Sequence, residues 1–274
     1  MEIELSIVIP CYNHGSFIKE ALNSIPLKEF PKTEVIIVND GSTDPYTVEV
    51  LGELSKQGYV VVNQVNQGLG RTRNNGIKLA KGKYILPLDA DNKLLGSYFS
   101  KGIKYLNEHP EVSVVYGDPI MFGDEEGHKP LRKFNLQQLI TGNYIDACAL
   151  YRKSAWEAVG GYDENMPYMG VEDWEFWLNL AFNGHKFYYL SEPCYYYRVA
   201  NKSMIKKDTA PNYSVLRFYI ESKHSSYLDF NAPAEALALK FKANPFVLIF
   251  KLILASYFPK IYKDCVEQKK IKRI

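Results

Sequence analysis

The sequence of 274 residues predicts an α/β protein built on a doubly wound, mostly parallel sheet. Short apolar runs alternate with helical patterns through the first half of the chain, as in strands joined by crossover helices. These runs are apolar throughout and do not alternate with polar residues, which is expected where helices cover both faces of a sheet. The composition, 46% apolar and 23% charged, is that of an ordinary globular protein.

The first half supplies the predicted parallel strands and the helices between them. Strands are expected over residues 5–9, 35–38, 59–63 and 84–88, and helices over residues 17–25, 45–57 and 69–80. Ser16 is placed to cap the first helix. Pro45 stands where the first turn of a helix tolerates proline.

Beyond residue 88 the pattern becomes a mixed α+β region on the same sheet. We expect helices over residues 95–107, 154–159 and 173–182, strands over residues 112–116 and 145–151, and a polar turn over residues 123–127. Residues 234–258 form a predicted helical tail that is interrupted at Pro245, since the residue before a proline disfavours helix.

Polar residues follow each of the four predicted parallel strands. The strands lead into Pro10-Cys11-Tyr12-Asn13, Asn39-Asp40-Gly41, Asn66-Gln67-Gly68 and Asp89-Ala90-Asp91. Open parallel sheets bind ligands beyond the carboxyl ends of their strands. The sequence therefore predicts a binding site at this edge, although Asp40 alone is equally well explained as a turn or cap residue.

Asp89 and Asp91 are the most specific chemical signal. Two carboxylates one residue apart, directly after a buried strand, cost desolvation free energy unless a positive charge neutralises them. Divalent cations such as Mg²⁺ and Mn²⁺ prefer carboxylate and phosphate oxygens. The pair therefore predicts a site for a divalent cation that also binds phosphate.

Residues 66–76 open the third helix with glycines and two arginines, Arg71 and Arg73. A glycine-rich helix start favours an anion, and arginine binds phosphate in a forked geometry. The segment is not a dinucleotide fingerprint, because Arg73 occupies the third glycine position.

Together these motifs resemble the family-2 glycosyltransferases with the GT-A fold. The resemblance covers residues 3–205 and rests on Ser6–Asn13, Ile37–Asp44, Asn66–Gly68, Arg73–Gly76 and Leu88–Asp91, followed by Gly160–Glu164 and Glu172–Leu178. It implies a GT-A domain over residues 1–205, with a nucleotide-sugar half (1–117) and an acceptor half (118–205). Residues 206–274 would form a C-terminal helical extension.

The resemblance also implies an activity and a role for each matching residue. The enzyme would transfer a sugar from a nucleoside-diphosphate sugar, by default a UDP-sugar, to a hydroxyl of a saccharide or lipid-linked acceptor, with inversion and with Mn²⁺ or Mg²⁺. The nucleotide would contact Pro10, Tyr12, Asn13, Asp40, Asn66, Gly68, Arg73, Asp89 and Ala90, with Asp91 on the metal. Asp173 would be the catalytic base, and Glu172, Trp174, Arg198 and Ser203 would contact acceptor or phosphate.

Asp173 has a second explanation, because carboxylates at a helix start also compensate the helix dipole. One departure from the family is the absence of a histidine in residues 197–204, where members often carry one for metal or diphosphate. Two alternatives stay open at this point: a binding or scaffold module without catalysis, and a sugar-1-phosphate nucleotidyltransferase. The second would need a glycine-rich basic loop after the first strand.

Charge and terminal patterns suggest partners and location. A net charge of +2 gives no case for nucleic-acid binding. The start of the chain lacks a signal-peptide pattern, and its four cysteines are scattered, so a cytoplasmic protein with free thiols is expected. The apolar residues 246–258 are too few to cross a bilayer. Followed by the basic residues 260–273, they would lie at the inner membrane surface, or pack on the domain or on a second subunit of a homodimer.

Overall fold

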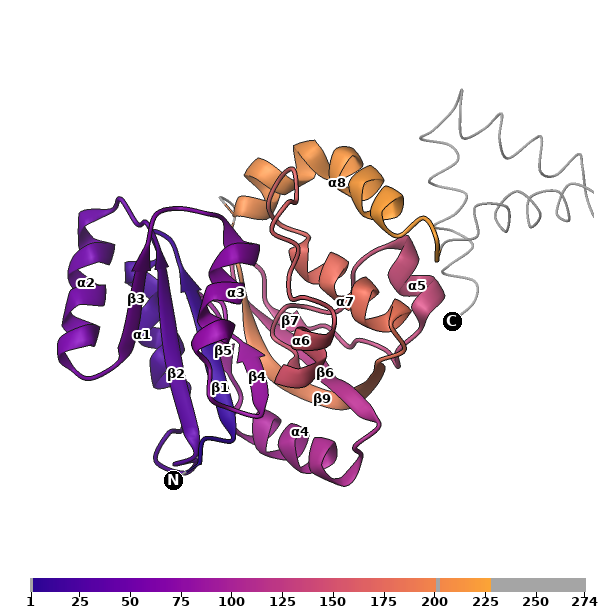
Figure 1. The fold of residues 1–274 in the computed structure, drawn as a ribbon. Coiled ribbons are helices and arrows are strands. Elements are labelled where there is room, and N and C mark those ends of the chain that lie inside the picture. The colour runs from indigo at the N-terminus through magenta and orange to yellow at the C-terminus, as the bar shows by residue number, and fades with distance from the viewer. Residues whose placement is uncertain (1, 201–202, 228–274) are drawn as a thin grey trace, which may run out of the picture. The chain divides into compact units, whose positions relative to one another are not determined.

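The computed structural model describes residues 2–200 and 203–227. By its internal contacts the chain divides into two units, residues 1–223 and residues 224–274. The fold described below is that of the first unit (Figure 1). The predicted division at residue 205 stays a prediction. The predicted helical tail over residues 234–258, its apolar stretch 246–258 and its basic end lie outside the described residues.

The first half of the chain forms the predicted parallel sheet. Strands β1 (Leu5–Cys11), β2 (Thr33–Asp40), β3 (Val60–Gln64) and β4 (Tyr84–Pro87) lie in the order β3-β2-β1-β4, and each neighbouring pair is parallel. They are connected by α1 (Gly15–Asn23), α2 (Pro45–Lys56) and α3 (Leu69–Leu79). Asp44 caps α2, since its carboxylate accepts a hydrogen bond from the Thr47 amide.

The second half extends the same sheet in mixed directions. After β4 the order continues β8-β6-β9-β5, with β7 paired to β6. These strands are β5 (Lys93–Leu94), β6 (Val112–Gly123), β7 (Gly127–His128), β8 (Leu150–Arg152) and β9 (Lys186–Val199). Strand β8 runs antiparallel to both β4 and β6, whereas β6 and β9 are parallel. The helices of this second half are α4 (Gly96–Glu108), α5 (Leu136–Thr141), α6 (Lys153–Ala158), α7 (Glu172–Phe182), the π-helical turn η1 (Ile205–Thr209) and α8 (Ala210–Lys223).

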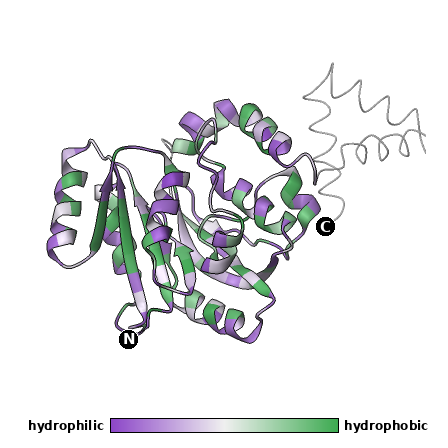
Figure 2. Cartoon of the chain, in the orientation of Figure 1, coloured by the Kyte–Doolittle hydropathy of each residue, from purple (hydrophilic) through white to green (hydrophobic). Residues whose placement is uncertain are grey.

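Helices cover both faces of the sheet, as the apolar strands predict. Ile7 and Ile9 pack in one core with residues of α1, α2 and α4. Val8 points to the other face and packs in a second core with residues of α3, α6 and α7. Figure 2 shows the apolar colouring of the central strands between these helices. A Cβ on Gly76 would lie 2.4 Å from Val8 Cγ1, so this glycine lets α3 approach the sheet closely.

Three local expectations are wrong. Helix α1 begins at Gly15, so Ser16 lies inside it, and the Gly15 amide instead donates to Thr47 Oγ1 at 2.9 Å. The strand expected over residues 145–151 starts only at Leu150, because the preceding segment turns, with Asp146 accepting from the Cys148 amide. Strand β3 is an edge with Val60 49% exposed, so it is not covered on both faces.

No helix within the described ranges, 2–200 and 203–227, is both long and apolar enough to cross a membrane. Cys11, Cys148 and Cys194 are buried free thiols.

Candidate active site

A cavity of about 510 Å³ lies at the carboxyl ends of β1, β2 and β4. All of its lining residues belong to the first unit. Nine of the residues predicted for the site line it: Pro10, Tyr12, Asp40, Asn66, Asp89, Ala90, Asp91, Arg198 and Ser203. The cavity thus gathers strand ends that are far apart in the sequence, as the topology of a parallel sheet predicts.

Asp40 is buried at the end of β2 and holds the loop that follows β3. Its Oδ1 accepts hydrogen bonds from Gln64 Nε2 and from the Gln67 amide, each at 2.8 Å, and its Oδ2 accepts from the Gly68 amide at 3.0 Å. Gly68 has a φ of 86°, a left-handed conformation that favours glycine. Gly68 therefore shapes the loop around Asp40 and does not itself line the cavity.

Asn13 joins the ends of β1 and β2 and is not among the cavity residues. Its Oδ1 accepts from the amides of Thr43 and Asp44, at 2.8 and 2.9 Å, and its backbone has a φ of 56°. The side chain fixes the loop beside Tyr12, which is 45% exposed at the mouth of the cavity.

Asp89 and Asp91 face the cavity in different electrostatic settings. Asp89 Oδ1 accepts from Arg73 at 2.8 Å. Burial, reinforced by the charge of Asp89, raises the pKa of Asp91, and the charges of His14 and Arg198 offset this only in part. The carboxylate of Asp91 is therefore short of positive charge, which is the condition that a bound cation would correct.

Arg73 is buried behind the cavity and connects the two halves of the domain. Besides Asp89 at the end of β4, it contacts Glu172 Oε1 at the start of α7, at 3.3 Å. The guanidinium carbon lies 5.6 Å from the ring centre of Tyr162. Arg73 Nε has no hydrogen-bond partner among the described residues. The buried guanidinium therefore holds Asp89 and Glu172 in place and does not open onto the cavity.

Helix α7 begins with the two carboxylates that the sequence singled out. Glu172 is 3% exposed and accepts from the Gly170 amide at 2.7 Å as well as from Arg73. Asp173 is partly exposed, and its Oδ2 accepts from Asn143 Nδ2 at 2.9 Å. Burial, followed by the charges of Glu172 and Asp146, raises the pKa of Asp173 to about 8. Such a group exchanges a proton near neutral pH, as a general base must.

Asp146, Tyr197 and His14 belong to this region although the sequence does not single them out for it. Burial and the charges of Asp89 and Asp91 raise the pKa of Asp146 to about 7. Tyr197 lines the cavity, and the same carboxylates add to burial in raising its pKa. His14 lines the cavity too, from the turn after β1. These residues are recognised only once the loops are folded together.

Arg198 occupies the segment that lacks the family's histidine. Its Nε donates to the Asp91 carbonyl at 3.0 Å, its backbone amide donates to Asn92 Oδ1, and its guanidinium pairs with Glu20. Its guanidinium carbon also lies 4.5 Å from the ring centre of Phe17. A fixed positive charge therefore stands beside Asp91, in the position where a diphosphate could contact it.

Trp174 lies in the core and does not reach the cavity. The side chain is fully buried, and its indole Nε1 donates to the Leu139 carbonyl at 2.6 Å. Tyr213 of α8 stacks on it with the ring planes 6° apart. Its observed contacts therefore support helix α7.

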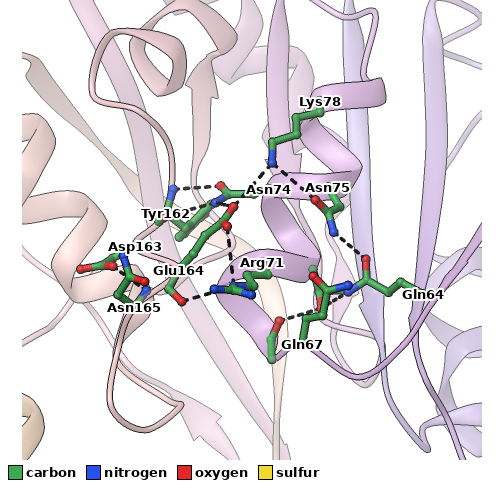
Figure 3. A network of polar contacts seen from close by, with 12 residues as sticks. Gln64, Gln67, Arg71, Asn74, Asn75, Lys78, Tyr162, Asp163, Glu164 and Asn165 are labelled. Atoms are coloured by element: carbon green, nitrogen blue, oxygen red, sulfur yellow. Dashed lines mark hydrogen bonds and ion pairs between the residues drawn. The ribbon is translucent and has the colours of Figure 1, made fainter.

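A polar network ties α3 to the loop before α7 (Figure 3). Asn74 accepts from the Tyr162 amide through Oδ1 and donates to the Tyr162 carbonyl and to Glu164 through Nδ2, each at 2.9 Å. Arg71 lies 3.6 Å from Glu164 Oε2. Gly161, with a φ of 83°, passes so close that a Cβ there would be 2.7 Å from Asn74 Oδ1. The network fixes the helix that carries Arg73 against the segment that leads to Asp173.

Comparison with known proteins decides the family. The sequence profile of Glycosyl transferase family 2 matches residues 6–160, which is more than half of the chain. The chain belongs to this family. The protein is therefore a glycosyltransferase, and the nucleotidyltransferase and non-catalytic alternatives give way to this assignment.

Relatives of this glycosyltransferase agree with the assignment. An uncharacterized glycosyltransferase of Methanocaldococcus jannaschii is 25% identical over 80% of both chains. The poly-beta-1,6-N-acetyl-D-glucosamine synthase of Staphylococcus epidermidis is 33% identical over 42% of this chain and 28% of its own. The crystal structure of S. aureus TarS 1-349 in complex with UDP-GlcNAc superposes with a TM-score of 0.61 at 21% identity.

The TarS match covers 74% of this chain and 61% of the solved one, so this chain spans less than two thirds of that structure. At this identity the likeness shows the fold. It confirms the predicted GT-A fold, with its curled, mostly parallel sheet.

In the part of the chain that the structure describes, side chains alone do not form a complete metal site. Within residues 2–200 and 203–227, no group of three or more His, Cys, Asp and Glu side chains could hold a metal ion. A cation held there would therefore need further ligands from outside the protein, such as phosphate oxygens.

Proposed function

We propose that this glycosyltransferase transfers a sugar from a UDP-sugar to a hydroxyl of a saccharide or lipid-linked acceptor, with inversion at the anomeric carbon. The observation that supports it best is the placement of Asp40 and Asp91 along one cavity while Arg73 connects Asp89 to the start of α7, where Asp173 lies. Asp173 is not itself among the cavity-lining residues, and in this proposal a donor held along the strand ends directs its reactive carbon out of the cavity toward α7. The UDP-GlcNAc complex of TarS supports the choice of nucleotide.

The nucleobase would occupy the part of the cavity near Tyr12, Asp40 and Asn66. Asp40 has three hydrogen bonds from its own protein, two on Oδ1 and one on Oδ2. A carboxylate has about four acceptor positions, so one on Oδ2 is left for an N–H group of the base. Tyr12, half-exposed at the mouth, would pack against the ring.

In the proposed reaction Asp173 accepts the proton of the acceptor hydroxyl. The oxygen forms a bond to the anomeric carbon from the face opposite the diphosphate. The carbon–oxygen bond to the diphosphate breaks, and UDP leaves with the electron pair. Because attack and departure occur on opposite faces, a single carboxylate base suffices and the product is inverted.

Asp91 would hold the divalent cation, Mn²⁺ or Mg²⁺, together with the diphosphate. When bound, the cation offsets the negative charge that develops on the leaving UDP. Arg198, beside Asp91, and Ser203, on the cavity wall, are placed to contact the phosphates.

Titration calorimetry of UDP with and without Mn²⁺ tests this proposal. The wild-type protein should bind UDP at least about 10-fold more tightly with Mn²⁺, and Asp91→Ala should remove that difference. Asp163→Asn is the matched control, because Asp163 lies in the loop before α7, pairs with Lys223 of α8 and does not line the cavity. Equal Mn²⁺ enhancement in wild type and Asp91→Ala would refute the metal role.

A further inference from the structure

The proposed base, Asp173, is held on both sides of its carboxylate. Its Oδ1 lies 2.7 Å from the Trp174 amide, and its Oδ2 accepts from Asn143 Nδ2 at 2.9 Å. Nucleophiles and bases in enzymes are commonly oriented by a further group of this kind. Asn143 lies thirty positions before Asp173, on the loop between α5 and β8.

The orientation of the Asn143 amide follows from a second contact. Its Oδ1 accepts from the Ile145 amide at 3.1 Å. Since an amide group has its donor and acceptor on opposite atoms, this contact turns the NH₂ group toward Asp173. The group that meets the carboxylate is therefore a donor, which stabilises the ionised form of Asp173.

Two tryptophans of α7 hold the loop that carries Asn143. Trp174 Nε1 donates to the Leu139 carbonyl at 2.6 Å, and Trp177 Nε1 donates to the Ile145 carbonyl at 3.0 Å. Both indoles are fully buried. Helix α7, which has Asp173 in its first turn, thus fixes both ends of the segment that carries the Asn143 donor.

We propose that Asn143 is the positioning residue of the catalytic base, holding the Asp173 carboxylate in the orientation that receives the acceptor proton. This inference rests on the proposed role of Asp173. It adds a residue outside the cavity and outside the motifs of the sequence, and it assigns Trp174 and Trp177 to the support of that residue.

The other charged and titratable groups around Asp173 come from α7 itself and from four other segments. Glu172 precedes it on α7 and Asp146 lies on the loop before β8, and both raise its pKa. Arg73 of α3 lowers it. Tyr162, before α7, and Tyr197, on β9, are near enough for the charge of Asp173 to act on them. Asn143 is an uncharged donor within this largely acidic surrounding.

Asn143→Asp removes the NH₂ donor but keeps the shape of the side chain. The aspartate can still accept from the Ile145 amide, so the loop keeps that bond, but it places a second carboxylate against Asp173. We expect turnover at pH 7 to fall at least about 10-fold and the apparent pKa of the base to rise by at least about one unit. Asn143→Ala, which removes the donor without adding a charge, should give a smaller change in the same direction.

The matched control is Thr141→Ala. Thr141 is exposed at the end of α5, two residues before Asn143, and its hydroxyl donates to the Gln138 carbonyl, not to Asp173. This variant should keep the wild-type pH profile. UDP affinity should be unchanged in all three variants.

A second readout does not depend on turnover. The pKa of Asp173 is raised in the folded protein, so this residue should lower stability as pH increases from about 4 to about 8. The difference in melting temperature between wild type and Asp173→Asn across this range therefore reports its ionisation. In an Asn143→Asp background the same difference should move to higher pH.

An unchanged ionisation of Asp173 in both Asn143 variants would overturn the inference, and so would an equal shift in Thr141→Ala. Full activity of Asp173→Asn would instead refute the proposed base, whatever the Asn143 variants show. If Asn143→Asp unfolds, the comparison of Asn143→Ala with Thr141→Ala carries the test.

Discussion

The carboxylate of Asp173 should control how activity depends on pH. Because its pKa is raised to about 8, a growing fraction is ionised as pH rises from 6 to 8, and only this form accepts a proton. We therefore expect kcat/KM to increase with pH up to about 8. Asp173→Asn should lower turnover about 100-fold or more and abolish this dependence.

Release of UDP from a UDP-sugar, followed between pH 6 and 9, provides the measurement. The affinity for UDP, measured in parallel, should be the same in Asp173→Asn and wild type. A wild-type profile without any rise in this range would contradict the assignment.

Arg73 and Arg71 lie on the same helix, but we expect their replacement to lower stability by very different amounts. Arg73 is buried between Asp89 and Glu172, so Arg73→Ala would leave two carboxylates without their partner. We expect a loss of about 3–5 kcal/mol in the free energy of unfolding. The side chain of Arg71 is 42% exposed beside Glu164, and Arg71→Ala should cost less than about 1 kcal/mol.

Urea denaturation of the two arginine variants and the wild type compares these costs directly. Similar losses for both variants would show that the buried guanidinium is not the link between the two halves that its contacts indicate.

At the scale of elements, the close approach of the loop before α7 to α3 depends on one glycine. Gly160 and Gly161 both have left-handed backbones, with φ of 79° and 83°. A Cβ at Gly161 would meet Asn74 and Trp156 at 2.7–2.9 Å, whereas a Cβ at Gly160 has nothing within 4 Å. Gly160→Ala should therefore cost only the backbone strain of about 1–2 kcal/mol.

Gly161→Ala should cost clearly more, because it adds a collision with the Asn74 amide that organises the polar network. Thermal or urea denaturation checks the order of the two variants. If Gly160→Ala were the more damaging one, packing against α3 could not be the reason for the second glycine.

The parallel half of the sheet was predictable because each of its central strands is a short run buried on both faces. A short apolar run in the sequence is enough to identify each of these strands, and polar turn residues mark their ends. β9 was missed: its tyrosine-rich sequence, Lys186–Val199, is mostly half-buried, and Pro193 interrupts it. The pairing of β6 with β9 also shifts register near Asp118, and no local sequence pattern predicts such a shift.

The same contrast holds for the site. Residues at strand ends, such as Asp40 and Asp91, could be predicted because topology alone brings strand ends together. Asn143 and Asp146 could not, because they are placed by the packing of α7 against the α5–β8 loop. His14, which the sequence did not assign to the site, reaches the cavity through the turn before α1.

For the whole molecule, the position of the cavity predicts the effect of truncation. Every lining residue lies at or before Asp208, inside the first unit. A chain ending at Lys223 should therefore bind UDP with Mn²⁺ as the full chain does, within about a factor of three. Calorimetry on both chains tests this, and a loss of binding on truncation would show that residues 224–274 complete the site.

The predicted peripheral membrane association can be examined with the same two chains. Flotation with anionic vesicles should recover the full chain and leave the truncated one behind, if residues 246–273 are the part that contacts lipid headgroups. Equal flotation of the two would exclude that role.

The half-buried carboxylates in and near the cavity have a consequence for the order in which ligands bind. Besides burial, the charge of Asp89 raises the pKa of Asp91, the charges of Asp89 and Asp91 raise that of Asp146, and the charge of Asp146 raises that of Asp173. Arg73 offsets only part of this effect on Asp146 and Asp173. A bare diphosphate would bring further negative charge into a region that is already anionic. We therefore expect the sugar nucleotide to bind together with its counter-cation or after it, and not as a bare diphosphate.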